Sequence, residues 1–237
     1  MFEPRWRRKL PPPMRCTSRH RRVAAVLLAV FTVATGTAGS QQGPPKDPAA
    51  TRAADLVELV TLDPGIKLDV RYATSNNFVG RPLYREARAF LQRPAALALA
   101  AAHRELGEHG YGLMIHDGYR PWAVTKLFWE VTPPALHEFV ADPAVGSKHN
   151  RGAAVDLTMY DRAFGAAVVM PSGYDEMTRR AYPDYDGGPP DARARRDLLR
   201  AVMERHDFTV EPNEWWHFNY KDWKEYPILD IPFDAIH

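Results

Sequence analysis

The segment SKHNRGAAVDLTMY, residues 147–160, constrains the fold more than any other part of the chain. In its second half Val155 and Leu157 share one face of a strand, so that Asp156 points to the other face. Gly152 allows a sharp backbone turn between this strand and the loop before it. An aspartate within an apolar strand is costly to bury unless it is paired or binds a metal. The fold must therefore supply Asp156 with a local cap or salt bridge, or with a metal ion.

The first 40 residues have the pattern of a secretory signal. MFEPRWRRKLPPPMRCTSRHRR contains eight Lys/Arg and one acidic residue, and an apolar run follows from Val23 to about Ala38. Small residues end this run, as they do before a signal cleavage site. An uncleaved signal anchor is the alternative, although about 16 apolar residues are short against the roughly 20 that a spanning helix needs. We expect residues 1–40 to be a signal peptide and the mature protein to be periplasmic or secreted.

Without the signal, the chain is acidic and has no cysteine. The whole chain has 31 basic and 29 acidic residues, whereas residues 41–237 have 23 and 28, a formal charge of −5. This balance gives no attraction to nucleic acid, and membrane attachment is expected only if the signal stays uncleaved. No stable protein partner is evident. Because the only cysteine is Cys16, the mature chain must be held by its core or by a metal.

The rest of the chain predicts one domain of the α+β class. A chain of 237 residues with 45% hydrophobic residues can build one domain of ordinary size. Residues 41–54 begin with a Gln-, Gly- and Pro-rich stretch and are expected to be a flexible lead, followed by a catalytic domain over residues 55–237. Helices are predicted within residues 93–112, 123–131 and 192–208, with further helical turns in 134–140, and short strands within 66–70, 113–115, 153–158 and 209–220. This order indicates a mainly antiparallel central sheet flanked by helices.

Two of the nine histidines fall in patterns that suggest a metal site. His217 lies in EWWHF, three residues after Glu214, and such a spacing can place a carboxylate beside a metal-bound imidazole. On its own this pattern is weak. Together, His149, Asp156 and His217 offer two imidazoles and one carboxylate, which suit zinc and leave a fourth position open for water. Glu214 is then the natural general base. We interpret His116, the other candidate, as structural.

The ordered motifs resemble those of a known enzyme family. S-x-H-x-x-G-x-A-x-D, followed some sixty residues later by E-x-x-H, resembles the signature of the zinc D-alanyl-D-alanine peptidases. The blocks RYATSNNFVG, DGYRPW, GYDEM and EWWHF are similar, more narrowly, to those of the D-alanyl-D-alanine dipeptidases associated with vancomycin resistance and cell-wall dipeptide recycling. The resemblance runs from about Leu56 to Phe233. It implies the hedgehog/D,D-peptidase fold and hydrolysis of the D-Ala-D-Ala dipeptide to two D-alanines.

The resemblance also implies roles for particular residues. It implies one Zn2+ per chain on His149, Asp156 and His217, with Glu214 as general base toward an activated water. Arg120, in YRP, matches the arginine that stabilises the tetrahedral intermediate.

The substrate contacts that the resemblance implies come from other segments. Ser147 and Asp175 match positions that hold the free ammonium group of the substrate, and Tyr72 matches a substrate-contacting tyrosine. Asp117 is expected to support Arg120 rather than to touch the substrate.

Two alternatives remain open at this point. A D,D-carboxypeptidase that acts on peptidoglycan stem peptides has the same metal site, and the export signal lends weight to it. Against this, GYDEM and RYATSNNF fit the dipeptidase pattern better. A non-catalytic zinc-binding domain of the same fold, as in hedgehog signalling proteins, has no use for a general base or an oxyanion partner. The presence of Glu214, Arg120 and Asp175 together therefore favours an enzyme.

Overall fold

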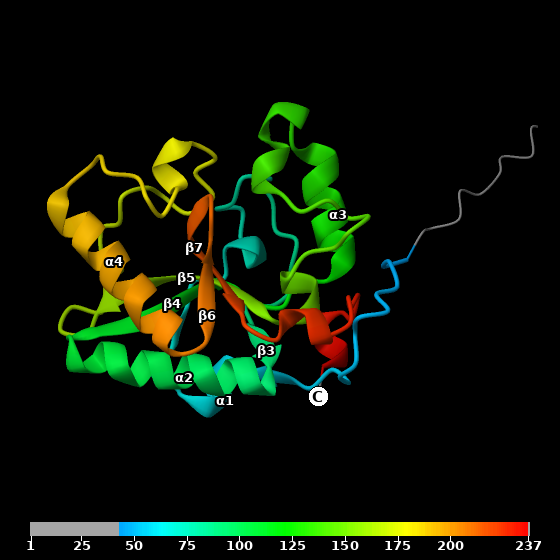
Figure 1. Cartoon of the computed structure of the whole chain (residues 1–237), viewed down its shortest axis with the longest axis horizontal. Coiled ribbons are helices and arrows are strands. Elements are labelled where there is room, and N and C mark those ends of the chain that lie inside the picture. The colour runs from blue at the N-terminus through cyan, green and yellow to red at the C-terminus, as the bar shows by residue number, and fades with distance from the viewer. Residues whose placement is uncertain (1–42, 237) are drawn as a thin grey trace, which may run out of the picture. The chain divides into compact units, whose positions relative to one another are not determined.

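The computed structural model describes residues 43–236, so the expected signal peptide lies outside the described residues. Figure 1 shows a central sheet with helices packed around it. The strands are β1 Leu56–Glu58, β2 Lys67–Leu68, β3 Phe90–Gln92, β4 Tyr111–Asp117, β5 Ala154–Asp161, β6 Phe208–Glu211 and β7 Glu214–Tyr220. The helices are α1 Leu59–Leu62, α2 Arg93–Glu108, α3 Trp122–Val131 and α4 Pro190–Arg205. Within residues 43–236, no helix is both long and apolar enough to cross a membrane.

The central sheet has five strands in the order β2-β4-β5-β7-β6. Only β2 and β4 run parallel, and the other neighbouring strands are antiparallel. Strands β1 and β3 form a separate two-stranded antiparallel sheet. Helix α2 packs on β4, helix α4 packs on β6, and the two helices contact each other. The predicted α+β class with a mainly antiparallel sheet is confirmed.

The hydrophobic core lies between β5 and the two long helices. Val155 and Leu157 of β5 are fully buried and pack in one cluster with Leu99 of α2 and Leu199 of α4. Each such side chain contributes about 1.5–3 kcal/mol relative to an exposed position. Because strand side chains alternate, the same packing directs Asp156 to the opposite face of the sheet. The apolar alternation in the sequence therefore fixes which face of the sheet carries the polar site.

The helices begin and end where their sequences indicate. Pro94 lies in the first turn of α2, where its missing N–H leaves no helical hydrogen bond unmade. Two residues after α2 ends, Gly110 adopts a φ of 83°. The stretch after α3 forms a 3-10 turn over Pro134–Phe139. The strand predicted within residues 209–220 is in fact a hairpin of two strands, because Pro212 and Asn213 turn the chain between them.

The expected flexible lead makes specific contacts over the part that the structure describes. The carboxylate of Asp47 accepts a hydrogen bond from the guanidinium of Arg151. The backbone N–H groups of Thr51 and Arg52 both donate to the carbonyl of Glu225, at 2.9 Å each. In Figure 1 this blue segment runs beside the red C-terminal segment. The lead is therefore packed against the domain from Asp47 onward.

Candidate metal centre and active-site pocket

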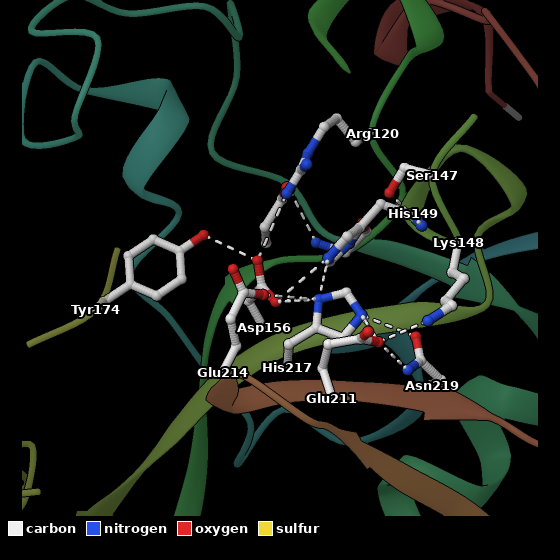
Figure 2. Close-up of polar contacts among 12 residues, drawn as sticks. Arg120, Ser147, Lys148, His149, Asp156, Tyr174, Glu211, Glu214, His217 and Asn219 are labelled. Atoms are coloured by element: carbon white, nitrogen blue, oxygen red, sulfur yellow. Dashed lines mark hydrogen bonds and ion pairs between the residues drawn. The ribbon is translucent and has the colours of Figure 1, made fainter. Parts of the chain in front are cut away.

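Three buried side chains from two strands and a loop meet at one point (Figure 2). Asp156 comes from β5, His217 from the adjacent β7, and His149 from a 3-10 turn that Gly152 ends with a φ of 63°. Asp156 and His217 are directly opposite each other in the antiparallel pair. The nitrogen His149 Nε2 lies 3.2 Å from Asp156 Oδ1 and 3.0 Å from His217 Nδ1, which is itself 3.0 Å from Asp156 Oδ1.

The outer hydrogen bonds of both imidazoles determine which ring nitrogens carry hydrogen. His149 Nδ1 lies 2.7 Å from the carbonyl oxygen of Gly118, which can only accept, so Nδ1 is the protonated nitrogen. His217 Nε2 lies 2.7 Å from the amide oxygen of Asn219. The orientation of that amide is fixed because its nitrogen donates to Glu211 at 2.6 Å. In its neutral form, each ring therefore directs a lone pair at the common point.

The convergence of three lone pairs fits a metal cation. Among the described residues, Asp156 Oδ1 is one of two buried side-chain polar atoms without a hydrogen-bond partner. Ligand atoms around a tetrahedral zinc with bonds of about 2.0–2.1 Å lie about 3.3 Å apart, close to the separations of 3.0–3.2 Å found among these atoms. Two imidazoles and a carboxylate are donors that zinc accepts. The donor set and its spacing thus agree with the predicted zinc ligands.

Electrostatics at this point also favour a cation. Although burial acts in the opposite direction, the adjacent carboxylate of Asp156 raises the pKa of His217 to about 9, so without a metal ion this ring takes up the positive charge itself. Burial likewise opposes ionisation of Asp156, but the two histidines hold its pKa well below the ordinary value. The carboxylate is thus ionised and its surroundings attract positive charge.

Glu214 reaches the same point because the β6–β7 hairpin is irregular. Val210 is opposite Phe218, whereas the next residue, Glu211, is opposite Glu214. The register shift leaves three residues of β7 without a partner in β6. In a regular strand two residues three positions apart face opposite sides, but here the carboxylate of Glu214 lies 3.6 Å from His217 Nδ1.

The environment of Glu214 suits a group that exchanges protons near neutral pH. Burial raises the pKa of Glu214 to about 8, and the negative charges of Asp156 and Asp175 act in the same direction, whereas His217 opposes them. A cation among the metal ligands would lower this value. A carboxyl group whose pKa lies near the working pH is an effective general base and acid.

Arg120 is held beside the ligands by a buried ion pair. Its Nε donates to Asp117 at 2.8 Å, and its terminal nitrogen lies 3.5 Å from Asp156. The guanidinium also lies 4.6 Å from the ring centre of Phe128. Burial raises the pKa of Asp117 despite the arginine, whereas Asp117 and nearby acidic groups raise that of Arg120 despite burial. We treat the pair as ionised, because a guanidinium keeps its proton at accessible pH. The expected support of Arg120 by Asp117 is confirmed.

A chain of hydroxyl groups connects Asp156 to Asp175. The hydroxyl of Tyr174 donates to Asp156 Oδ2 at 2.9 Å and lies 3.3 Å from that of Tyr72, which donates to Asp175 at 2.9 Å. Burial, with the charge of Asp156, raises the pKa of Asp175 to about 7. Asp175 also has a φ of 56°, an uncommon backbone conformation that is frequently found at functional sites.

The predicted site residues line one pocket of about 450 Å³. They are Tyr72, Arg120, Ser147, His149, Asp156, Asp175, Glu214 and His217. Ser147 lies two residues before His149, and its Oγ accepts the backbone N–H of that histidine at 3.2 Å. The structure therefore brings together all eight residues from six separate stretches of sequence. His116 does not line this pocket; its ring lies 4.6 Å from that of Tyr174, as suits a structural residue.

Sequence reasoning missed four residues around the ligands. Tyr174 binds Asp156, while Asn219, Glu211 and Lys148 form a polar chain that begins at His217. Lys148 donates to Glu211 at 2.6 Å. A signal existed for Asn219, because a residue two positions after a ligand on a strand shares its face. No comparable signal existed for Glu211, which depends on the hairpin.

Comparison with known proteins identifies the family of this chain. A family model described as D-ala-D-ala dipeptidase matches residues 52–233. The chain belongs to this family. Among the members that it is similar to, the D-alanyl-D-alanine dipeptidase of Escherichia coli (strain K12) is 35% identical over 182 residues, which are 77% of this chain and 93% of that protein. The D-alanyl-D-alanine dipeptidase of Enterococcus faecalis (strain ATCC 700802 / V583) is 35% identical over 188 residues, 71% of this chain and 89% of that protein.

The D-ala-D-ala dipeptidase family match includes every predicted site residue, from Tyr72 to His217. A solved vancomycin-resistance D,D-dipeptidase, in complex with a D-Ala-D-Ala phosphinate analogue, is 20% identical with a TM-score of 0.39. It covers 58% of this chain and 53% of its own.

Proposed function

We propose that this protein is a zinc-dependent D-alanyl-D-alanine dipeptidase that hydrolyses D-Ala-D-Ala to two D-alanines. One observation carries the proposal. In a member of the D-ala-D-ala dipeptidase family, ligand atoms of His149, Asp156 and His217 converge beside the carboxyl group of Glu214, whose pKa is raised. A buried guanidinium lies on the same pocket wall. These are the parts that hydrolysis of an amide requires: a metal site, a general base and a positive charge for the developing oxyanion.

The residues have distinct roles in this reaction. His149, Asp156 and His217 would hold the metal, which when bound supplies a Lewis acid and lowers the pKa of water. Glu214 takes a proton from the attacking water and delivers it to the leaving amine. Arg120 presents its charge where the carbonyl oxygen becomes negative, and this interaction strengthens in the transition state. Its ion pair with Asp117 keeps it in place before the substrate arrives.

The restriction to a free dipeptide comes from the Asp175 side of the pocket. Its carboxylate is removed from water enough to raise its pKa to about 7, so an ammonium group is a favourable partner. Tyr72 orients this carboxylate through its hydroxyl, and Ser147 offers a further polar contact. An N-acylated peptide brings no charge to Asp175 and leaves it without a counterion, which is costly.

Release of D-alanine from defined peptides tests the proposed function. Zinc-loaded purified protein is offered D-Ala-D-Ala, N-acetyl-D-Ala-D-Ala and L-Ala-L-Ala, and we expect cleavage of the free D,D-dipeptide alone. Efficient cleavage of the acetylated peptide would instead assign the protein to the carboxypeptidases. Absence of cleavage in all three cases, with zinc shown to be bound, would refute the dipeptidase proposal and favour a non-catalytic zinc-binding domain.

Two substitutions separate the base from the ammonium site. Glu214→Gln keeps the shape of the side chain and should lower kcat by about 10²–10⁴ while zinc content stays at one per chain. Asp175→Asn should mainly raise KM for D-Ala-D-Ala. It should therefore reduce the ratio of kcat/KM for D-Ala-D-Ala to kcat/KM for the acetylated peptide. Turnover that survives in Glu214→Gln would remove Glu214 as the base.

We further propose that the protein acts outside the cytoplasm, in the periplasm or as a secreted enzyme that scavenges dipeptide from the cell wall. The basic and apolar composition of residues 1–40 supports this location. Cell fractionation with N-terminal sequencing of the mature protein tests it. Recovery of the intact N-terminus in the cytosolic fraction would contradict it.

A further inference from the structure

A short segment that lies just before the region matched by the family contributes to the active-site pocket. We call residues 47–52 the N-terminal strap. The match to the D-ala-D-ala dipeptidase family begins at residue 52, so the strap precedes the part that this family shares. Nevertheless Asp47 and Ala49 line the pocket that contains the metal ligands. The strap is thus a part of the pocket wall that family membership does not explain.

The strap is fixed at both ends. At its start, Asp47 pairs with Arg151, whose side chain is only 5% exposed and whose guanidinium also donates to the carbonyl of Tyr226 at 2.5 Å. At its end, the N–H groups of Thr51 and Arg52 bind one carbonyl at 2.9 Å each. Hydrogen bonds of this kind, and a buried arginine that needs a counterion, hold the strap in a defined position.

The strap lies on the side of the metal ligands away from Asp175. From His217 a polar chain runs through Asn219 and Glu211 to Lys148. Lys148 and Arg151 each lie 5.5 Å from the ring centre of Trp223, and Arg151 binds the strap. On the other side, Tyr174 leads from Asp156 towards Asp175. Figure 2 shows Tyr174 and Lys148 on opposite sides of the ligands.

We propose that the N-terminal strap limits the size of the second residue of the substrate. This inference rests on the proposed function, in which Asp175 holds the ammonium group of the first residue. The scissile bond is then at the metal ligands, and the leaving residue extends towards Lys148, Trp223 and the strap. Ala49, a small residue, lines the same pocket. Asp47 neutralises Arg151, so the wall presents no unpaired guanidinium there.

Two substitutions alter this wall in opposite directions. Ala49→Phe adds bulk to the wall, and Asp47→Ala releases the strap from Arg151. Ala53→Phe is the matched control, because Ala53 is exposed and does not line the pocket. The substrates are D-Ala-D-Ala, D-Ala-D-Phe and D-Phe-D-Ala, which vary the second and the first residue separately.

We expect Ala49→Phe to lower kcat/KM for D-Ala-D-Phe by about tenfold relative to D-Ala-D-Ala, since a poor fit of one apolar group costs this much. Asp47→Ala should raise the same ratio, and Ala53→Phe should leave it unchanged. The kcat/KM for D-Phe-D-Ala relative to D-Ala-D-Ala should stay the same in every variant. Equal effects on both phenylalanine peptides, or none in either strap variant, would overturn the proposal.

Binding provides a second measurement that does not need turnover. The dissociation constant of D-Ala-D-Phe is measured by calorimetry with zinc-loaded Glu214→Gln protein, with and without Ala49→Phe. The added phenylalanine should weaken binding of D-Ala-D-Phe but not of D-Phe-D-Ala, and equal weakening would again overturn the role of the strap. Lack of D-Ala-D-Ala cleavage by the unmodified protein would count against the proposed function, whereas unchanged peptide ratios count only against the strap.

Discussion

Replacing Asp117 by alanine should destabilise the protein and disable Arg120 together. Asp117 is 1% exposed and accepts three hydrogen bonds, from Arg120 Nε at 2.8 Å, the hydroxyl of Tyr84 at 2.9 Å and the backbone N–H of Gly118 at 3.0 Å. Removing one partner of a buried ion pair costs about 3–5 kcal/mol. Because Arg120 keeps a carboxylate 3.5 Å away, Asp156, we expect the lower half of this range, about 3–4 kcal/mol.

Two further variants isolate the source of this loss. Asp117→Asn keeps an acceptor oxygen for Tyr84 and Gly118 but loses the charge, so it should cost about 1–2 kcal/mol. Asp55→Ala breaks another aspartate–arginine pair, with Arg93, at 2.7 Å. Both of those side chains are 54% exposed, so the change in unfolding free energy should lie close to zero. The contrast between the two alanine variants measures what burial adds.

Urea unfolding followed by circular dichroism, at fixed pH and zinc concentration, gives the free energies. Initial rates with D-Ala-D-Ala give the second readout: kcat/KM should fall by up to about 10²–10³ in Asp117→Ala, the effect of losing one oxyanion partner. A loss of stability in Asp117→Ala no larger than in Asp55→Ala would refute the reasoning about burial. Unchanged kcat/KM in a folded Asp117→Ala protein would show that Arg120 needs no support.

Three other outcomes follow from the structure. Asn219→Leu removes the acceptor that fixes the His217 ring and should weaken zinc binding about 10–100-fold, measured by competition with a chromogenic chelator. Gly152→Ala should lower the free energy of unfolding by about 1–2 kcal/mol because of the positive φ, and by more because the added methyl group meets Leu56. Gly110→Ala is the control in urea unfolding, because Gly110 also has a positive φ but has open space around it. Burial lowers the pKa of His103, and its neutral Nδ1 accepts the backbone N–H of Leu113. The contribution of His103 to the free energy of unfolding is therefore present above about pH 6.5 and is lost as the pH falls. His103→Gln should therefore flatten the fall in unfolding free energy from about pH 7 to 5, and an unchanged slope would contradict this.

A chain of polar side chains fixes the orientation of His217, one of the three candidate metal ligands. Glu211 fixes the Asn219 amide, the amide fixes the imidazole, and Lys148 balances the charge of Glu211. Despite burial, the charge of His217 and the hydrogen bond from Lys148 lower the pKa of Glu211. The carboxylate therefore remains an acceptor, and in its neutral form the imidazole has the tautomer that directs the Nδ1 lone pair at the other two ligands.

Much of the fold could be predicted because periodicity records which residues are buried. The alternation around Asp156 gave both the strand and the face that carries the carboxylate, and Pro94 with the alanine run gave α2. The hairpin of β6 and β7 was missed, because Pro212 and Asn213 interrupt a stretch that otherwise has strand composition throughout. Its irregular register has no counterpart in the sequence pattern.

For the site, the sequence determined the kinds of ligand, and the tertiary structure determined how they meet. His149, Asp156 and Glu214 could be proposed from the sequence because their motifs resemble those of a known family, and because an aspartate in an apolar strand needs a partner. The distances of 3.0–3.2 Å, the tautomers and the approach of Glu214 depend on contacts between segments far apart in the chain. Local patterns cannot encode these, since each arises from packing and register across strands. The strap is the same case: composition indicated a flexible lead, and only its contacts with Arg151 and Glu225 make it part of the pocket.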